Sequence, residues 1–128
     1  MQRSEDLKKM ITKTKERINK MMNPDPNEYN YDDYKFKFYR GKYEFGGGTA
    51  LMAICDTGEP YATISVNFDE VKIPKDHIFL DMNNCKHLCQ QMIDDGLLEL
   101  TGLQRPSGYC IYPAARMTDK LKEILEDF

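Results

Sequence analysis

An alternation of polar and apolar residues over Gly58–Phe68 (GEPYATISVNF) constrains the fold more than any other stretch of the chain. A period of two is the pattern of a strand that buries one face and turns the other to water or to a partner. Pro60 belongs at the start of this strand because it cannot donate to a ladder, and Asp56–Glu59 before it is a turn. The turn joins the strand to Thr49–Cys55 (TALMAIC), which predicts an antiparallel hairpin at the centre of a small sheet.

The composition is that of a folded domain. Of the 128 residues, 41% are hydrophobic and 30% are charged, and a chain of this length can bury a core without metal ions or disulfides. The longest apolar runs fall well short of the roughly 20 residues that a membrane span needs. The first ten residues, MQRSEDLKKM, lack the apolar region of a signal peptide, so we expect the protein to stay in the cytoplasm.

The charge is divided between a basic N-terminal segment and an acidic body. Residues 1–22 carry seven cations and three anions, so their net charge is +4, which leaves −7 for the rest of a chain with a net charge of −3. The apolar residues of this segment fall along one narrow helical face. We therefore predict a basic helix over 1–22, a proline-rich linker over 23–28 and a single α+β domain over 29–128. The narrow face suits docking on the protein's own sheet or helix pairing in a dimer, so monomer and dimer stay open.

We predict an α+β fold. It consists of a small antiparallel sheet of about five strands, an N-terminal helix, a middle helix and a C-terminal helix. Tyr34–Tyr39 has the alternation of a half-buried strand, and its outward lysines favour the edge of the sheet. The middle helix is expected to be capped by Asn83 or Asn84 and to run to about Asp95.

The C-terminal part is expected to contain a loop, a strand and a helix. Gln104–Gly108 is rich in turn-forming residues and predicts a loop. Tyr109–Tyr112 predicts a last strand that Pro113 ends. Thr118 is expected to cap a final helix over Asp119–Phe128, whose apolar residues recur with helical spacing.

Cys85, His87 and Cys89 form the most suggestive local motif. Cys85 and Cys89 share a helix face, whereas His87 points roughly to the opposite side, so a regular helix cannot place all three on one ion. A zinc site would need Cys110 and a further ligand from elsewhere in the chain. We therefore expect no metal and no cofactor, and free thiols at all four cysteines, Cys55 included. A place near a helix N-terminus favours a thiolate at Cys85, but the sequence leaves the reactivity of Cys85 and Cys89 open.

Three blocks, in a fixed order, carry a resemblance to a known family. They are GEPYATISVN at 58–67, Asp81-x-Asn83-Asn84, and Thr101-Gly102 followed by SGYCIYP at Ser107–Pro113. Together they resemble an uncharacterised family, a domain of unknown function found on conjugative elements, plasmids and phages of gut bacteria. The resemblance covers about residues 41–116. Where the family continues after the YP pair with an aromatic and then acidic residues, this chain has Ala114-Ala115-Arg116.

The resemblance implies a genomic setting and no reaction. Small accessory proteins of mobile elements commonly act by stoichiometric binding to host proteins, including the blocking of restriction or CRISPR machinery. The first hypothesis is therefore a non-enzymatic protein that binds a host protein, such as a defence nuclease whose basic channel an acidic surface can occupy. The residues expected to contact this partner, besides the exposed face of the central hairpin, are Tyr29, Tyr31, Asp32, Asp33 and Tyr34.

Two alternatives belong to other functional classes. One is a nucleic-acid-binding accessory factor whose affinity falls steeply with salt, and it would use the cations of the first segment, namely Lys8, Lys9, Lys13, Lys15, Arg17 and Lys20. The other is a small-molecule binder or an enzyme, and it requires several loops to converge on one pocket. Its candidate residues are Asp81, Asn83, Ser107 and Tyr109.

Overall fold

The computed structural model describes residues 26–45, 48–68 and 71–127. The predicted basic helix over 1–22, and the part of the predicted linker before residue 26, lie outside these residues. The described part contains two helices and nine strands: β1 (Tyr29–Tyr31), β2 (Tyr34–Lys42), β3 (Thr49–Cys55), β4 (Pro60–Thr63), β5 (Ser65–Val66), β6 (His77–Leu80), α2 (Lys86–Asp94), β7 (Leu98–Ser107), β8 (Cys110–Met117), α3 (Asp119–Ile124) and β9 (Leu125–Asp127).

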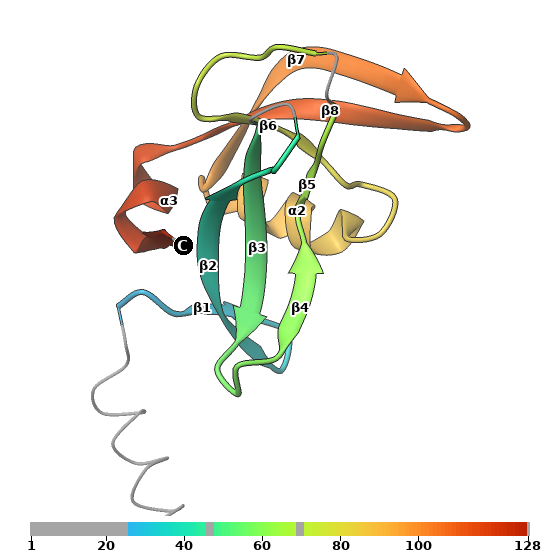
Figure 1. The fold of residues 1–128 in the computed structure, drawn as a ribbon. Helices are drawn as coiled ribbons and strands as arrows, with labels where there is room; N and C mark the ends of the chain where they lie inside the picture. Colours follow the sequence, from blue (N-terminus) through green and yellow to red (C-terminus); the bar gives the residue numbers. More distant parts are fainter. Residues whose placement is uncertain (1–25, 46–47, 69–70, 128) are drawn as a thin grey trace, which may run out of the picture.

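The strands form two sheets rather than the single predicted sheet (Figure 1). The first has the order β1-β2-β3-β4, and β9 pairs with β2 as its fifth strand; the second has the order β5-β6-β8-β7. All the pairings are antiparallel except that of β9 with β2. The α+β class is confirmed, whereas one sheet of about five strands is wrong because the chain divides its strands between two sheets.

The predicted central strand is the place where the chain changes sheets. Its residues form β4 in the first sheet and β5 in the second, and each stands at the end of its strand order. Between them, the Ile64 amide donates to the Leu51 carbonyl at 2.8 Å, and the Ile64 carbonyl accepts from the Asp81 amide at 2.8 Å. The hairpin of β3 and β4 is confirmed, but a continuous central strand is wrong because Ile64 bonds to both sheets in turn.

Ser65, next to this junction, is a buried polar residue whose hydroxyl has hydrogen-bond partners. Its hydroxyl accepts a hydrogen bond from the Leu51 amide at 2.9 Å and lies 2.8 Å from the Tyr43 hydroxyl. A buried hydroxyl with partners on both sides avoids the cost of desolvation. The alternation predicted Ser65 on the exposed face, and these two partners explain why it is buried instead.

β2 is an inner strand, not the predicted edge strand. It pairs with β3 on one side and, on the other, with β1 near its start and with β9 further along. The alternation itself is confirmed, since Phe36 and Phe38 are fully buried. The edge prediction is wrong because β9 comes from the C-terminus, where the sequence favours a longer helix.

The C-terminal part departs most from the predictions. Gln104–Ser107 is not a loop but the end of β7, and β8 continues through Pro113 to Met117. Pro113 is tolerated because β6 pairs only with β8 residues beyond it, and the register of β7 against β8 shifts just before Gln104. The resulting hairpin of β7 and β8 extends away from the body of the molecule (Figure 1).

The helices are shorter than predicted. Cys85, not Asn83 or Asn84, is the N-cap of α2, because the Asp81 carboxylate accepts hydrogen bonds from Asn84 and closes a turn before the helix. Thr118 caps α3 as predicted, and its hydroxyl accepts from the Leu121 amide at 3.3 Å. The helix then ends at Ile124, where the chain becomes β9, so a helix to the C-terminus is wrong.

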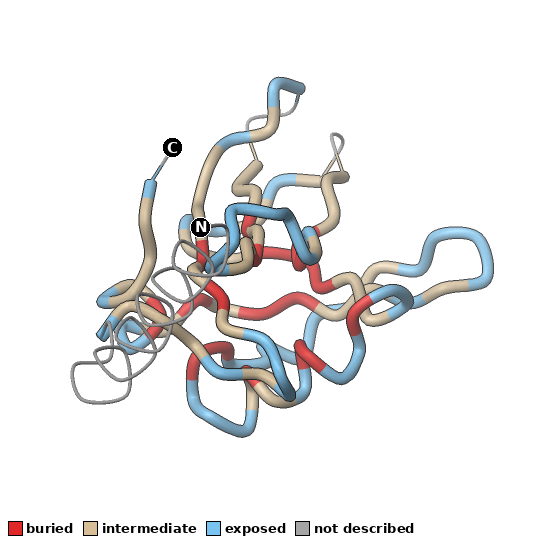
Figure 2. Tube along the Cα trace, turned by 90° about the horizontal axis from the view of Figure 1, so that it is seen from below, coloured by how far each residue is buried: buried red, intermediate tan, exposed pale blue. Residues whose placement is uncertain are grey.

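One hydrophobic core joins both sheets and both helices (Figure 2). It contains Phe36 and Phe38 of β2 and the inward residues of α2. Leu88, Cys89 and Met92 form the inward side of α2, and its N-cap Cys85 is also buried.

A group of ion pairs holds α3 and β9 against β2. The Asp76 carboxylate lies 2.7 Å from Lys122 of α3 and 3.8 Å from Arg40 of β2, and Arg40 pairs with Asp127 of β9 at 2.8 Å. The hydrogen bond from Lys122 lowers the pKa of Asp76. Since this pKa lies below its unfolded value, the carboxylate stabilises the fold above that value, and the contribution is lost as the pH falls through the folded pKa.

Asp76→Asn tests this contribution with little change of shape, because asparagine also tolerates the left-handed backbone of this position, where φ is 68°. The melting temperature of the variant is expected to lie a few degrees below that of the parent at neutral pH. The difference should shrink once the pH falls below the ordinary aspartate value of 3.8. A difference that does not change with pH would mean that the ion pairs contribute nothing.

Candidate acidic and aromatic interface

Two turns meet at one end of the first sheet. The turn from β1 to β2 contains Asp32 and Asp33, and the turn from β3 to β4 runs from Asp56 to Glu59. A hydrogen bond joins the two turns, since the Asp56 amide donates to the Lys35 carbonyl at 3.0 Å. All four carboxylates are exposed.

Four aromatic rings gather beside these turns. The Tyr61 ring centroid lies 4.6 Å from that of Phe36, 4.9 Å from that of Tyr34 and 6.3 Å from that of Tyr31. Phe36 is fully buried beneath the group, whereas Tyr34 is 45% exposed and Tyr61 is 40% exposed. We call this surface the acidic–aromatic end, defined by Tyr31, Tyr34, Tyr61, Asp32, Asp33, Asp56 and Glu59.

The electrostatics of the acidic–aromatic end suit a positively charged ligand. Residues 29–36 and 56–61 carry these four carboxylates against one cation, Lys35. Partial burial, with the neighbouring tyrosines and Asp32, raises the pKa of Tyr61, so its phenol stays protonated and can donate a hydrogen bond. Ring faces that carry partial negative charge, set among carboxylates, attract arginine and lysine side chains.

Tyr29 has a different role from the other tyrosines of the predicted interface. Its ring packs on Phe38 at a centroid distance of 5.3 Å. Its hydroxyl donates to the Asp95 carboxylate at 2.5 Å and accepts from the Gln91 amide at 3.0 Å. Burial, followed by the hydrogen bond to Asp95, raises the pKa of Tyr29. Tyr29 therefore ties β1 to α2 and its C-terminal end.

Tyr29→Phe removes only these two hydrogen bonds and is expected to lower the free energy of unfolding by about 1 kcal/mol. Urea denaturation measures this change. The ring and its packing on Phe38 are retained. An unchanged free energy of unfolding would mean that the Tyr29 hydroxyl does not tie β1 to α2.

A pocket of about 390 Å³ adjoins the acidic–aromatic end. One wall consists of Tyr31, Tyr61 and Ala62, and the other is the start of α2. Cys85 and His87 both line this pocket although the helical spacing predicts different faces, because Cys85 is the non-helical N-cap. The other lining residues from that wall are Asn84, Lys86 and Leu88.

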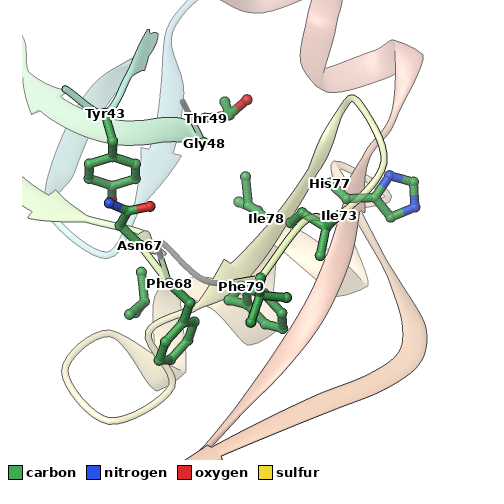
Figure 3. A pocket seen from close by; sticks show the side chains of 11 residues that line it. Tyr43, Gly48, Thr49, Asn67, Phe68, Ile73, His77, Ile78 and Phe79 are labelled. Atoms are coloured by element: carbon green, nitrogen blue, oxygen red, sulfur yellow. The ribbon is translucent and has the colours of Figure 1, made fainter. Parts of the chain in front are cut away.

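A second pocket lies between the two sheets, with a volume of only about 30 Å³ (Figure 3). Figure 3 shows Tyr43, Asn67 and Phe68 along one side of it, with Phe79 beside Phe68 and Ile73 next to His77. This volume corresponds to about one water molecule. It is too small for an organic ligand.

The residues predicted for a small ligand lie in two places. Asp81 and Asn83 follow β6, where the Asp81 carboxylate is engaged with Asn84. Ser107 and Tyr109 lie at the tip of the β7–β8 hairpin, and the Tyr109 ring is fully exposed. A ring in that position lines no pocket. The cations predicted for nucleic acid all lie within 1–22, outside the described residues.

The β7–β8 hairpin exposes apolar residues that sequence reasoning missed. Leu100, Leu103, Tyr109 and Ile111 are between 49% and 109% exposed. The sequence predicts a loop over Gln104–Gly108 and therefore does not indicate one long hairpin, although the residues before and after this stretch have strand-forming side chains. Tyr61 belongs to the exposed face of the central hairpin that the sequence predicts for the interface, and its ring reaches the tyrosines of β1 and β2 through the pairing of β4 with β3.

Among the described residues, no three or more His, Cys, Asp or Glu side chains are grouped so that they could hold a metal ion. No helix in the same part of the chain is long and apolar enough to cross a membrane.

A family model matches residues 31–128, a range that contains both sheets except the first two residues of β1. That model is described as a domain of unknown function, DUF4313. The chain belongs to this family. No curated protein and no solved structure matches the chain. The DUF4313 match begins within β1, so it includes every residue of the acidic–aromatic end.

Proposed function

We propose that the protein acts by binding a basic protein partner through its acidic–aromatic end. The observation that carries the proposal is the exposure of Tyr34 and Tyr61, which pack on the buried Phe36 next to two turns with four exposed carboxylates. Tyrosine rings that pack on a buried side chain such as Phe36 lose little conformational entropy on binding. Tyrosine is enriched among the dominant residues of protein interfaces for this reason.

The proposed partner is a host protein, and the proposed setting is a phage or another mobile element. The acidic–aromatic end has the charge to occupy a surface that normally binds nucleic acid, since such surfaces are rich in arginine and lysine. A defence nuclease is a partner of this kind. Binding in this mode requires no catalytic group, so the protein is proposed to act stoichiometrically.

The immobilised full-length protein, exposed to nuclease-treated host lysate at moderate salt, tests this function. We expect one host protein to be retained in stoichiometric amount by the parent and lost from a Tyr34→Ala, Tyr61→Ala variant. A matched control, Leu103→Ala with Tyr109→Ala, removes two exposed side chains from the β7–β8 hairpin and should retain the partner.

Retention by the tyrosine variant but not by the hairpin variant would move the interface to the hairpin. Retention that nuclease abolishes would favour the nucleic-acid alternative and the cations of residues 1–22.

A further inference from the structure

Two cysteine thiols meet at the start of α2, beside an open pocket. The sulfur atoms of Cys85 and Cys89 are 3.7 Å apart, within contact distance. Cys89 is fully buried, whereas Cys85 lines the pocket of about 390 Å³ together with Tyr31 and Tyr61. Cys85 is 7% exposed and borders this pocket, whereas Cys89 has no exposed surface, so Cys85 is the more accessible of the two.

The two thiols have different surroundings, and these favour a different chemical role for each. Either thiol can donate the hydrogen bond between them, and this bond lowers the pKa of Cys85 and, together with burial, raises that of Cys89. As a thiol, Cys85 can also donate to the Asp81 carbonyl, 3.2 Å away. Cys85 stands at the N-terminus of α2, where the helix dipole favours a thiolate. Cys85 is thus the attacking group and Cys89 the resolving group.

The backbone at Cys85 leaves room for the sulfur atoms to approach. Cys85 is the N-cap, with φ of −134° and ψ of 41°, so it is not held in the helical conformation that Cys89 adopts. A disulfide needs a sulfur separation of about 2.05 Å, and rotation of the Cys85 side chain supplies movement toward Cys89 without breaking the hydrogen bonds inside α2.

We propose that Cys85 and Cys89 are a redox site that forms a reversible disulfide by exchange with a small-molecule disulfide of the glutathione type. The Cys85 thiol loses its proton to water, its thiolate attacks one sulfur of that disulfide, the S–S bond breaks, and the first half leaves as a thiolate that takes up a proton from water. Cys89 then attacks the Cys85 sulfur, the mixed disulfide breaks, and the second half leaves and takes the proton that Cys89 gives up. Two protein thiols are oxidised and one disulfide is reduced to two thiols, so atoms and electrons balance.

The other two cysteines provide an internal reference. Cys55 and Cys110 are each partly exposed, and each lies in a strand. Among the described residues, neither of them forms a hydrogen bond with a second cysteine, in contrast to Cys85 and Cys89. Exposure alone would therefore favour oxidation of Cys55 and Cys110 over the buried pair.

The test incubates the full-length protein with oxidised glutathione without oxygen, alkylates the remaining thiols at intervals, and maps the peptides by mass spectrometry. We expect the Cys85–Cys89 disulfide to form about tenfold faster than glutathione adducts on Cys55 or Cys110. A Cys55→Ser, Cys110→Ser variant should form it at the same rate. Adducts on Cys55 or Cys110 that precede any change at Cys85 would overturn the proposal.

Cys89→Ser separates the two steps. With the resolving thiol removed, the first step is expected to halt at a stable glutathione adduct on Cys85, which adds one glutathione to the mass. An unmodified Cys85 in the folded variant would contradict its role as the attacking thiol. The mapping of the parent protein decides the proposal by itself if this variant does not fold.

Discussion

Replacing Phe36 with alanine is expected to lower the free energy of unfolding by about 3–5 kcal/mol. Phe36 is fully buried in an inner strand, and its ring contacts those of Tyr31, Tyr34 and Tyr61. Removal of the Phe36 ring leaves a cavity in the core and removes the buried ring against which the exposed tyrosines pack. Because small domains are stable by only about 5–15 kcal/mol, the loss is a large fraction of the total.

Urea denaturation followed by circular dichroism measures this change. The matched control is Phe45→Ala, since Phe45 is 70% exposed and its truncation should change the free energy of unfolding by less than about 0.5 kcal/mol. Equal effects of the two substitutions would mean that Phe36 is not part of the core.

Tyr34→Ala combined with Tyr61→Ala is expected to weaken binding of the retained partner by about 1,000-fold, since tyrosines at the centre of an interface each contribute on the order of 2 kcal/mol. Both rings are 40–45% exposed, so their truncation should leave the fold stable. Isothermal titration of the purified partner measures the affinity. The Leu103→Ala, Tyr109→Ala control should bind like the parent.

The charges around these rings should act differently from the rings. Neutralising Asp32, Asp33 and Glu59 as Asp32→Asn, Asp33→Asn, Glu59→Gln is expected to slow association and to flatten its dependence on salt, because exposed charges at an interface mainly steer the approach of a partner. An association rate that is unchanged by these substitutions would show that the partner is not basic at this surface.

Local patterns predicted the strands better than the sheets. The alternation over Tyr34–Tyr39 identified Phe36 and Phe38 as core residues because burial of one strand face is a local property. The position of a strand within a sheet depends on distant partners instead. Along Phe38–Arg40, β2 is an inner strand because β9, 87 residues later in the chain, pairs with it there.

The candidate interface could be predicted only in part for the same reason. Tyr31, Tyr34 and the two aspartates between them are close in sequence, so their clustering could be read from the chain. Tyr61 and Glu59 reach the same place through the pairing of β3 with β2 and β4. The contact of Cys85 with Cys89 was expected from helical spacing, but the pocket beside it depends on the approach of β1 and β4 to α2.

Hydrogen–deuterium exchange of the protein, alone and bound to its retained partner, tests the proposed interface most directly. The proposal predicts slowed exchange of the backbone amides in the two turns of the acidic–aromatic end, over 32–34 and 56–61, and little change in the β7–β8 hairpin. Protection confined to residues 100–111, with both turns exchanging as in the free protein, would contradict it.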